Sequence, residues 1–425
     1  MEMRPYWHAT ATPFANAAAG EVAGRADVVV IGAGFTGLSA ALALAERGAS
    51  VVVLEAGKVG GGASGRNGGH VNNGTAVDFG GLVARFGVDA ARSLYHAYDD
   101  AVDTVERLVR EHQITCDFRR GGKIKLAAKP EHYEKIARSF ELLQRDADPD
   151  TALVPRGELR SEIGSDAFHG GLVYRKSAQM HMGRFAAGLA DAAVRHGVRI
   201  YEDASVTGLR RLQGSAHDVQ SARGAVTAKQ VFVATGPSQK GPFGWFRRRV
   251  IPIGSFIIAT EPLSPAQLDD IMPTRRTATT TKHVGNYFRI SPDDRLIWGG
   301  RARFALSSPI SDAKSGRVLQ ASLRQVFPQL GNVGIDYCWG GVIDLTADRL
   351  PRAGEHDGLF YAMGYSGHGA QMSVHMGQMM ARVMGGEKAA NPLRDLRWKA
   401  IPGHFGPPWF MPFVGAYYRL QDRLH

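Results

Sequence analysis

A glycine-rich turn between a short apolar run and a helical segment constrains this chain more than any other feature. The β-branched run 28–31 is too short for a buried helix, and the turn G-A-G-F-T-G at residues 32–37 follows it directly. Residues 38–47 are rich in Ala and Leu, and Gly48 stands where a left-handed helix cap is expected. Together with the apolar run 51–54, this segment predicts a strand, a helix and a second, parallel strand.

The G-x-G-x-x-G spacing in this context is typical of a turn that binds a dinucleotide. A Cβ at Gly32 or Gly34 would collide with a pyrophosphate held by backbone N–H groups and by the positive end of the helix. Gly37 would let the helix and the strand pack closely. Glu55, at the end of the second strand, is placed to accept hydrogen bonds from a ribose diol. Both NAD and FAD fit this unit.

Three further glycine-containing segments favour FAD. They are residues 64–69, 234–236 and 364–369, and they lie far apart in the chain. A flavin needs additional backbone around its pyrophosphate and ring, whereas NAD needs no late glycine turn. Because the segment 364–369 precedes a predicted helix, the helix dipole would face the N1/C2=O edge of the flavin and stabilise the charge that appears on reduction.

The length and the pattern of elements predict two domains. The chain has 425 residues, of which 44% are hydrophobic and 21% charged, as in globular proteins. Long polar helices are expected over 86–144, and alternating apolar and polar residues over 251–337 favour an antiparallel sheet. The predicted fold class is α/β plus α+β: a Rossmann-like FAD-binding domain of residues 25–85, 165–250 and 338–390, interleaved with an antiparallel-sheet substrate (cap) domain of residues 86–164 and 251–337, with an N-terminal arm of residues 1–24 and a C-terminal tail of residues 391–425.

These motifs together resemble the D-amino-acid oxidase-type family of FAD-dependent oxidoreductases. The matching stretches are Y-W at 6–7, G-A-S-G-R-N-G-G at 62–69, F-P-Q-L at 327–330, G-Y-S-G-H-G at 364–369 and Y-Y-R-L-Q-D-R-L at 417–424. The resemblance covers nearly the whole chain, and it is strongest for the branch that oxidises γ-glutamylated polyamines. It implies a dissociable FAD and the transfer of hydride from the carbon beside an amine to flavin N5. The imine is then hydrolysed to an aldehyde or ketone.

One departure from the family narrows the substrate. α-Amino-acid oxidases of the family carry a W-x-G-L-R-P segment whose Arg clamps the substrate carboxylate. The corresponding run here, W-G-G-V-I-D at 339–344, has Ile343 where that Arg would stand, so a free α-amino acid is disfavoured. Arg289, Arg301 and Arg349 remain candidates for holding a more distant acid group.

Two further departures concern the flavin. The cysteine that binds flavin covalently in sarcosine-type members is absent, because Cys338 falls before the matching segment. The Lys that those members use toward oxygen is replaced near Ile297, so the resemblance leaves open whether oxygen or another acceptor reoxidises the flavin.

The candidate site residues follow from the motifs and the resemblance. His70, Tyr365 and His368 are the catalytic candidates, and Tyr287, Arg289 and Trp298 are the candidates for substrate binding. The expected cofactor-binding residues are Gly32, Gly34, Phe35, Thr36, Gly37, Glu55, Ala63, Ser64, Arg66, Asn67, Gly68, Gly69, Val206, Ala234, Thr235, Gly236, Gly340, Gly364, Tyr365, Ser366, Gly367, His368 and Gly369. No metal is expected, because the sequence has no zinc motif.

The expected partners are a small-molecule amine and O2 or another electron acceptor. The net charge of +11 is scattered, so no nucleic acid is expected, and membrane contact is possible but not favoured. With two cysteines and no apolar run long enough for a membrane span, a cytoplasmic protein is expected. The alternatives are an oxidase or dehydrogenase of a cyclic or N-substituted (pipecolate- or sarcosine-like) amino acid, a flavin-containing RNA-modifying or RNA-binding protein, and an NAD-dependent dehydrogenase.

Overall fold

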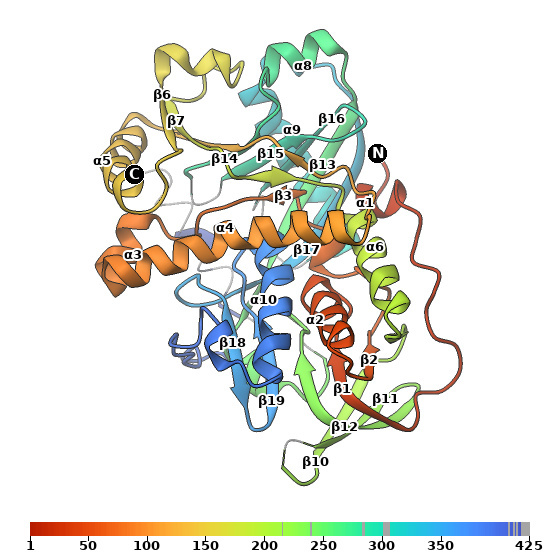
Figure 1. Ribbon diagram of the computed structural model, residues 1–425. Coiled ribbons are helices and arrows are strands. Elements are labelled where there is room, and N and C mark those ends of the chain that lie inside the picture. Colours follow the sequence, from red (N-terminus) through yellow and green to blue (C-terminus); the bar gives the residue numbers. More distant parts are fainter. Residues whose placement is uncertain are drawn as a thin grey trace.

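Two large β-sheets form the framework of the protein. The computed structural model describes residues 1–214, 216–238, 240–282, 285–300, 307–406, 409–410, 413 and 415–417. Figure 1 shows the two sheets at opposite ends of the molecule, with the long helix α4 (Val88–Glu111) crossing between them. A third, small sheet joins β3 (His70–Val71), β8 (Ala178–Gln179) and β4 (Arg119–Arg120).

The first sheet contains the strand–helix–strand unit that the sequence predicts. β1 (Arg25–Ile31) pairs in parallel with β2 (Val51–Leu54) and with β12 (Gly224–Val233), and α2 (Phe35–Glu46) connects β1 to β2. Gly48 has φ +87°, so the predicted left-handed turn after this helix is confirmed. The other strands are β9 (Arg199–Tyr201), β10 (Val206–Arg211), β11 (His217–Ser221), β18 (Arg352–His356) and β19 (Leu359–Met363).

Helix α10 (Gly369–Met384) comes from the end of the chain and packs on α2 from its beginning. The Ser39 hydroxyl donates to the Val374 carbonyl oxygen (2.7 Å), and Gln378 Nε2 donates to the Ser39 carbonyl oxygen (3.0 Å). A Cβ on Gly377 would lie 2.6 Å from the Thr36 carbonyl oxygen, so the two helices approach as closely as their backbones allow. The helix predicted after the segment 364–369 therefore exists, and its methionines fill the core between the helices.

The second sheet has the order β17, β13, β16, β15, β14, β5, β7, β6. Its strands are β5 (Lys123–Leu126), β6 (Ala152–Pro155), β7 (Gly170–Tyr174), β13 (Ile251–Pro262), β14 (Thr277–Thr280), β15 (Asn286–Ile290), β16 (Arg295–Gly300) and β17 (Ile335–Leu345). All but one of its pairings are antiparallel. β7 and β17 belong to this sheet, although the proposed division placed residues 170–174 and 338–345 in the FAD-binding domain.

The stretch 251–337 is not sheet alone. It also contains α8 (Pro265–Ile271) and α9 (Pro309–Val326), which the sequence interpretation did not anticipate. The Ser308 hydroxyl accepts a hydrogen bond from the Ser311 N–H and so caps the start of α9. α9 packs on β13 and β17 and covers one face of the second sheet.

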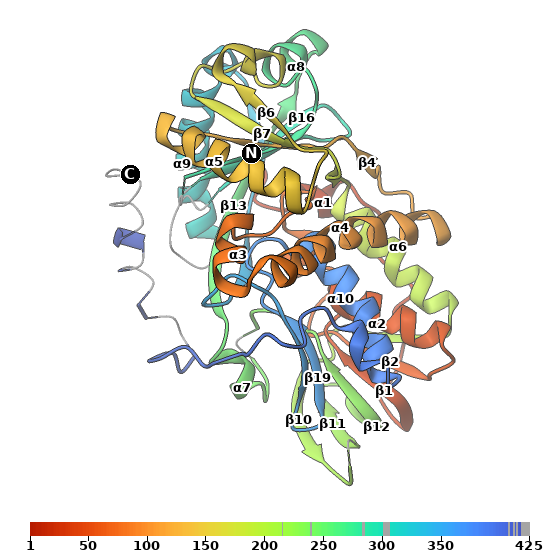
Figure 2. The ribbon, with the colours of Figure 1, turned by 60° about the vertical axis from the view of Figure 1, so that its left-hand side comes forward.

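The remaining helices surround the two sheets. They are α1 (Tyr6–Ala9), α3 (Phe79–Phe86), α5 (Pro130–Asp146), α6 (Met182–Arg195) and α7 (Gly244–Arg247). Figure 2 shows the segment after α10 running past the first sheet toward α7, where the Ile401 N–H donates to the Arg248 carbonyl oxygen. None of the helices in the described ranges combines the length and the apolarity that crossing a bilayer requires.

Candidate active site

A cavity of about 880 Å³ lies between the two large sheets. The ends of β1 and β2 reach it at Ile31 and Leu54, and Ala234 reaches it directly after β12. The second sheet contributes residues of β13, β14, β15 and β17 to the opposite wall. A crevice at the carboxyl ends of parallel strands is where open α/β sheets bind nucleotides, and this one is near the upper end of the usual size range.

The turn between β1 and α2 brings bare backbone to this cavity. Gly32 has φ +107°, and a Cβ there would lie 2.7 Å from the Ala234 carbonyl oxygen. A Cβ on Gly37 would lie 1.9 Å from the Gly32 carbonyl oxygen, so the turn closes only with glycine at that position. The N–H groups of the first turn of α2 have no acceptor within the helix; that of Phe35 donates to the Ser64 hydroxyl, and the others remain for an anion in the cavity.

Glu55 and Ser64 hold this turn in shape. The Ala33 N–H donates to Glu55 Oε2 (2.7 Å), and the Phe35 N–H donates to the Ser64 hydroxyl (2.9 Å). The Gly57 N–H donates to Glu55 Oε1 (2.8 Å). Burial raises the pKa of the Glu55 carboxyl, although the hydrogen bonds from these N–H groups act to lower it. The carboxylate therefore lines the cavity from a fixed position, with lone pairs remaining for a ribose diol.

We expect Glu55→Gln to weaken FAD binding by roughly tenfold or more, because an amide presents one acceptor oxygen where two N–H donors need one each. The measurement is the dissociation constant of FAD from the apoprotein, followed by flavin fluorescence. Glu21→Gln, at an exposed position outside the cavity, is the matched control and should bind FAD as the wild type does. Equal affinities for Glu55→Gln and the control would contradict this role.

The loop 63–69 crosses the cavity wall. Arg66 Nε donates to the Gly61 carbonyl oxygen (2.9 Å), and its Nη1 donates to the Gly340 carbonyl oxygen of β17 (3.1 Å). Asn67 Nδ2 donates to the Ser64 carbonyl oxygen (2.8 Å). The loop is thereby fixed to itself and to the second sheet, and its own backbone faces the cavity.

The late glycine turn is held by a carboxylate that sequence reasoning did not single out as a site residue. The Gly364 N–H donates to Asp344 Oδ2 (2.6 Å), and the Tyr365 N–H donates to Asp344 Oδ1 (3.2 Å). Burial raises the pKa of Asp344 to about 6. The turn directs the N-terminus of α10 to the cavity, which Gly367, His368 and Gly369 line.

Two histidines of the site are held neutral. Burial lowers the pKa of both His70 and His368 to about 3. His70 Nδ1 lies 3.1 Å from the Gly68 carbonyl oxygen, and its Nε2 lies 3.3 Å from the Phe288 carbonyl oxygen. A neutral imidazole has one N–H, so only one of these two contacts is a hydrogen bond. At neutral pH both imidazoles are therefore uncharged and are weak proton acceptors.

Two tyrosines also have fixed positions in the site. The hydroxyls of Tyr365 and Thr36 lie 2.9 Å apart, and those of Tyr287 and Ser255 lie 2.8 Å apart. The ring of His70 meets that of Tyr287 edge-on at a centroid distance of 5.6 Å. Burial raises the pKa of the Tyr365 hydroxyl, which stays protonated and can donate.

Most of the predicted site residues come together in this one cavity. Its lining includes Gly32, Gly34, Phe35, Thr36, Glu55, Ala63, Ser64, Arg66, Asn67, Gly68, His70, Val206, Ala234, Thr235, Gly236, Tyr287, Gly340, Tyr365, Ser366, Gly367, His368 and Gly369. Gly37, Gly69 and Gly364 lie behind it, where close packing requires glycine. Their contribution is to shape the turns and not to touch a ligand.

Arg289 and Trp298, which the sequence predicts to contact the substrate, are not among the residues that line the cavity. Arg289 is 1% exposed, and its Nη1 donates to the carbonyl oxygens of Gly69 (2.7 Å) and Met180 (2.8 Å). The guanidinium is thus used to fix the end of the loop 63–69. Trp298 is fully buried, and its ring stacks on Phe288 at 4.6 Å. Trp298, which pairs with Phe288, lies on the face of the sheet opposite Tyr287. Arg289 lies on the same face as Tyr287, but its guanidinium is held behind the loop 63–69.

Sequence reasoning missed several lining residues of the second sheet and its loops. They include Ser255, Thr279, Lys240 and Lys282. Lys282 follows β14, and Lys240 follows the turn after β12. The pattern over 251–337 predicts strands that contain or adjoin Ser255, Thr279 and Lys282, but which of these side chains meet the cofactor depends on how the sheets pair.

The residues present fit FAD. The cavity has a glycine turn at each of two helix N-termini, α2 and α10, and its volume suits a large dinucleotide. A Cβ on Gly34 would come within 3.0 Å of the Ser64 hydroxyl, so the backbone there stays bare. His368 Nδ1 is buried and has no hydrogen-bond partner among the described residues, which leaves it for a bound group.

The fold and this cavity define a flavin-dependent oxidoreductase. The chain belongs to the FAD dependent oxidoreductase family, whose sequence profile matches residues 27–383. It is 34% identical over 405 residues to the γ-glutamylputrescine oxidoreductase of Escherichia coli (strain K12), covering 94% of this chain and 93% of the relative. It is also 34% identical over 389 residues to the probable oxidoreductase OrdL of Haemophilus influenzae, covering 89% of this chain and 88% of the relative.

The fold also resembles those of solved oxidoreductase structures. Glycine oxidase from Geobacillus kaustophilus matches with a TM-score of 0.72 at 23% identity, over 89% of this chain and all of the other. L-proline dehydrogenase from P. horikoshii matches with a TM-score of 0.69 at 18% identity, over 92% and 99%. The predicted family, fold class and FAD cofactor are thereby confirmed, and the protein is an FAD-dependent amine oxidoreductase.

Proposed function

We propose that this protein oxidises an amine that carries a remote carboxylate, as γ-glutamylputrescine does. The observation that carries the proposal is the cavity wall formed by β17: it has Ile343, an apolar side chain, where family members that act on α-amino acids carry an arginine. The relatives at 34% identity include a γ-glutamylputrescine oxidoreductase.

Lysines at the rim supply the charge that a remote carboxylate needs. Lys240 and Lys282 both line the cavity, whereas Arg289 is committed to backbone oxygens behind it. Arg349 is not among the lining residues, and Arg301 lies outside the described residues. A carboxylate bound by a lysine at the rim, with the amine end deeper in the cavity, accounts for the absence of an arginine at residue 343.

The chemistry divides between the cofactor and the chain. When bound, FAD would accept a hydride, that is one proton and two electrons, from the carbon beside the substrate nitrogen. The chain's residues position that carbon: Tyr287 is oriented by Ser255, and the edge of His70 holds Tyr287 in place. With pKa values lowered to about 3 by burial, His70 and His368 are weak proton acceptors, so we infer that the amine loses its proton to solvent and binds as the free base.

Two further features belong to the proposal. We infer that O2 or a diffusible acceptor reoxidises the flavin, in a cavity that is open to small molecules. We also infer a cytoplasmic location, which is supported by two free cysteines, Cys116 and Cys338, that are both buried as thiols.

An anaerobic panel of amines tests the proposal. Purified enzyme is mixed with γ-glutamylputrescine, putrescine, proline, sarcosine and an α-amino acid, and bleaching of the flavin absorbance is followed. We expect γ-glutamylputrescine to bleach the flavin with kcat/KM at least about tenfold above putrescine, since one charged contact is worth roughly 1.5–3 kcal/mol. Lys282→Met should remove that preference while leaving putrescine oxidation unchanged.

Bleaching by proline, sarcosine or α-amino acids alone would overturn this choice of substrate. Air is then admitted to the bleached sample. Rapid return of the yellow colour supports O2 as the acceptor, and persistent bleaching that a quinone or dye reverses identifies a dehydrogenase.

A further inference from the structure

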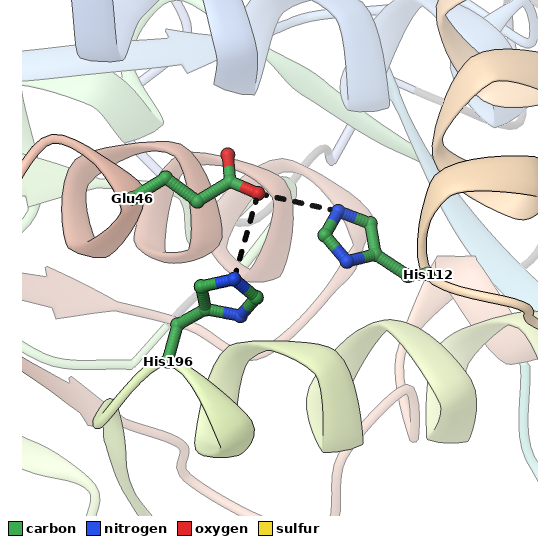
Figure 3. A group of neighbouring side chains, drawn as sticks. All are labelled: Glu46, His112 and His196. Carbon is green, nitrogen blue, oxygen red and sulfur yellow. Dashed lines mark ion pairs between the residues drawn. The ribbon is translucent and has the colours of Figure 1, made fainter.

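Three helices end at one point, at the far end of α2 from the dinucleotide turn. Glu46 is the last residue of α2, and His112 and His196 are the residues that follow α4 and α6 as their C-terminal caps. Figure 3 shows the three side chains pointing toward one another from three different helices. We propose that Glu46, His112 and His196 bind a zinc-class divalent cation that ties the ends of these helices together.

The spacing of the three ligand atoms suits a small cation. Glu46 Oε1 lies 3.3 Å from His112 Nε2 and 4.0 Å from His196 Nε2, and all three atoms lie within 4.8 Å of one another. Tetrahedral zinc with bonds of about 2.0–2.1 Å needs its ligand atoms roughly 3.3 Å apart. The first distance already has this value. Glu46 and His196 have side chains 34% and 38% exposed, so small rotations bring in the third ligand.

The hydrogen bond of the His196 imidazole leaves the correct nitrogen for a metal. His196 Nδ1 lies 2.9 Å from the Ala192 carbonyl oxygen, so its proton is on Nδ1 and the Nε2 lone pair faces the cluster. A ligating histidine whose other nitrogen donates to a backbone carbonyl is the usual arrangement in metal sites.

His112 gives an independent indication of a ligand. Its side chain is only 9% exposed, and its buried Nε2, although 3.3 Å from Glu46 Oε1, makes no hydrogen bond of acceptable geometry among the described residues. A buried polar atom in that state is rare, because losing its hydrogen bond to water costs free energy. The atom points at Glu46 and at the space between the three side chains, where a cation would complete its bonding.

The helix ends and the ligand types of this cluster favour a divalent cation of intermediate softness. Three helix C-termini meet here, and each carries a partial negative charge that adds to the carboxylate. Two imidazoles and one carboxylate suit Zn²⁺ and similar ions, whereas Mg²⁺ and Ca²⁺ prefer all-oxygen sites. Three protein ligands leave one position for water. The bound ion would cross-link α2, which begins at the dinucleotide turn, to α4 and α6.

Calorimetric titration of the FAD-loaded enzyme with ZnCl2, after treatment with a chelator, tests this proposal. We expect one Zn²⁺ per chain, a higher thermal midpoint in the presence of Zn²⁺, and neither effect with MgCl2. Glu46→Gln and His196→Gln should each weaken zinc binding by more than roughly tenfold. Both positions are partly exposed, and the flavin absorbance and metal-free thermal midpoint of each variant show whether it has folded.

His96→Gln is the matched control. His96 lies on α4 and also faces a carboxylate, with its Nδ1 3.7 Å from Asp99 Oδ2, but it belongs to no three-ligand cluster among the described residues. Zinc affinity should be unchanged in this variant. The proposal is overturned by a wild type that binds no zinc, by binding that survives in folded Glu46→Gln and His196→Gln, or by binding that His96→Gln also removes.

Discussion

Replacing Gly37 with alanine will yield protein that either fails to accumulate in soluble form or purifies without flavin. The added Cβ would lie 1.9 Å from the Gly32 carbonyl oxygen and 3.1 Å from Val30 Cγ1, and the oxygen belongs to the dinucleotide turn itself. Neither the backbone at Gly32 nor the first turn of α2 at Gly37 can move aside without opening the dinucleotide turn. We expect a loss of more than about 3 kcal/mol of folding free energy, which is typical of severe overpacking. The ratio of flavin to protein absorbance and the thermal midpoint measure both effects.

Gly157→Ala is the control for this variant. Gly157 lies in a short 3-10 helix at an exposed position, with no atom within 4 Å of the place a Cβ would take. It should retain flavin and unfold at the wild-type temperature. A Gly37→Ala protein with full flavin content and an unchanged thermal midpoint would show that the turn does not have the geometry described above.

Replacing Asp344 with asparagine will loosen the late glycine turn and lower FAD affinity by roughly tenfold to a hundredfold at neutral pH. The carboxylate accepts one hydrogen bond from the Gly364 N–H and one from the Tyr365 N–H, with a different oxygen for each. An amide supplies one oxygen and turns an N–H group toward the other donor. Leaving a buried donor without a partner costs about 1–3 kcal/mol. FAD affinity of the apoprotein is the measurement.

The pH dependence of stability gives a second readout for Asp344. Burial raises its pKa from the ordinary value of 3.8 to about 6 in the folded state. The folded protein therefore holds this proton more tightly than the unfolded chain. The stability that this brings is full below the unfolded pKa and is lost as the pH rises through about 6. The thermal midpoint of the wild type should thus fall, relative to that of Asp344→Asn, as the pH rises across this window.

Asp336→Asn serves as the control, because Asp336 lies on the same strand but pairs with Arg295 and does not line the cavity. Its FAD affinity should equal that of the wild type. If Asp344→Asn also binds FAD normally and shows the wild-type dependence of the thermal midpoint on pH, then the carboxylate does not hold the turn.

The cofactor side of the site could be predicted from sequence because its signals are local. The turn at 32–37 needs glycine for reasons that lie within a few residues, and Glu55 follows from the length of one strand–helix–strand unit. The glycine segments 64–69, 234–236 and 364–369 could be assigned to FAD, because a flavin needs additional backbone around its pyrophosphate and ring. The cavity brings all of them together.

The substrate side could not be predicted in the same way. Arg289 lies on the same face of β15 as Tyr287, but its guanidinium binds carbonyl oxygens of Gly69 and Met180, which come from distant segments. Trp298 lies on a predicted strand, but alternation along a strand does not say which face meets the cofactor. That choice is set by the pairing of β15 with β14 and β16. The cluster of Glu46, His112 and His196 was equally invisible, because its members come from three helices and meet only through tertiary packing.

The packing of α10 against α2 has a consequence for how the protein is made. The nucleotide turn is complete by residue 37, yet β19 and α10, which close the other side of the cavity, come from residues 359–384. During synthesis the apolar surface of α2 that α10 covers therefore stays uncovered until residues 369–384 have been made and have left the ribosome. We therefore expect FAD to bind only after β19 and α10 are in place, and a product truncated before α10 to bind no FAD.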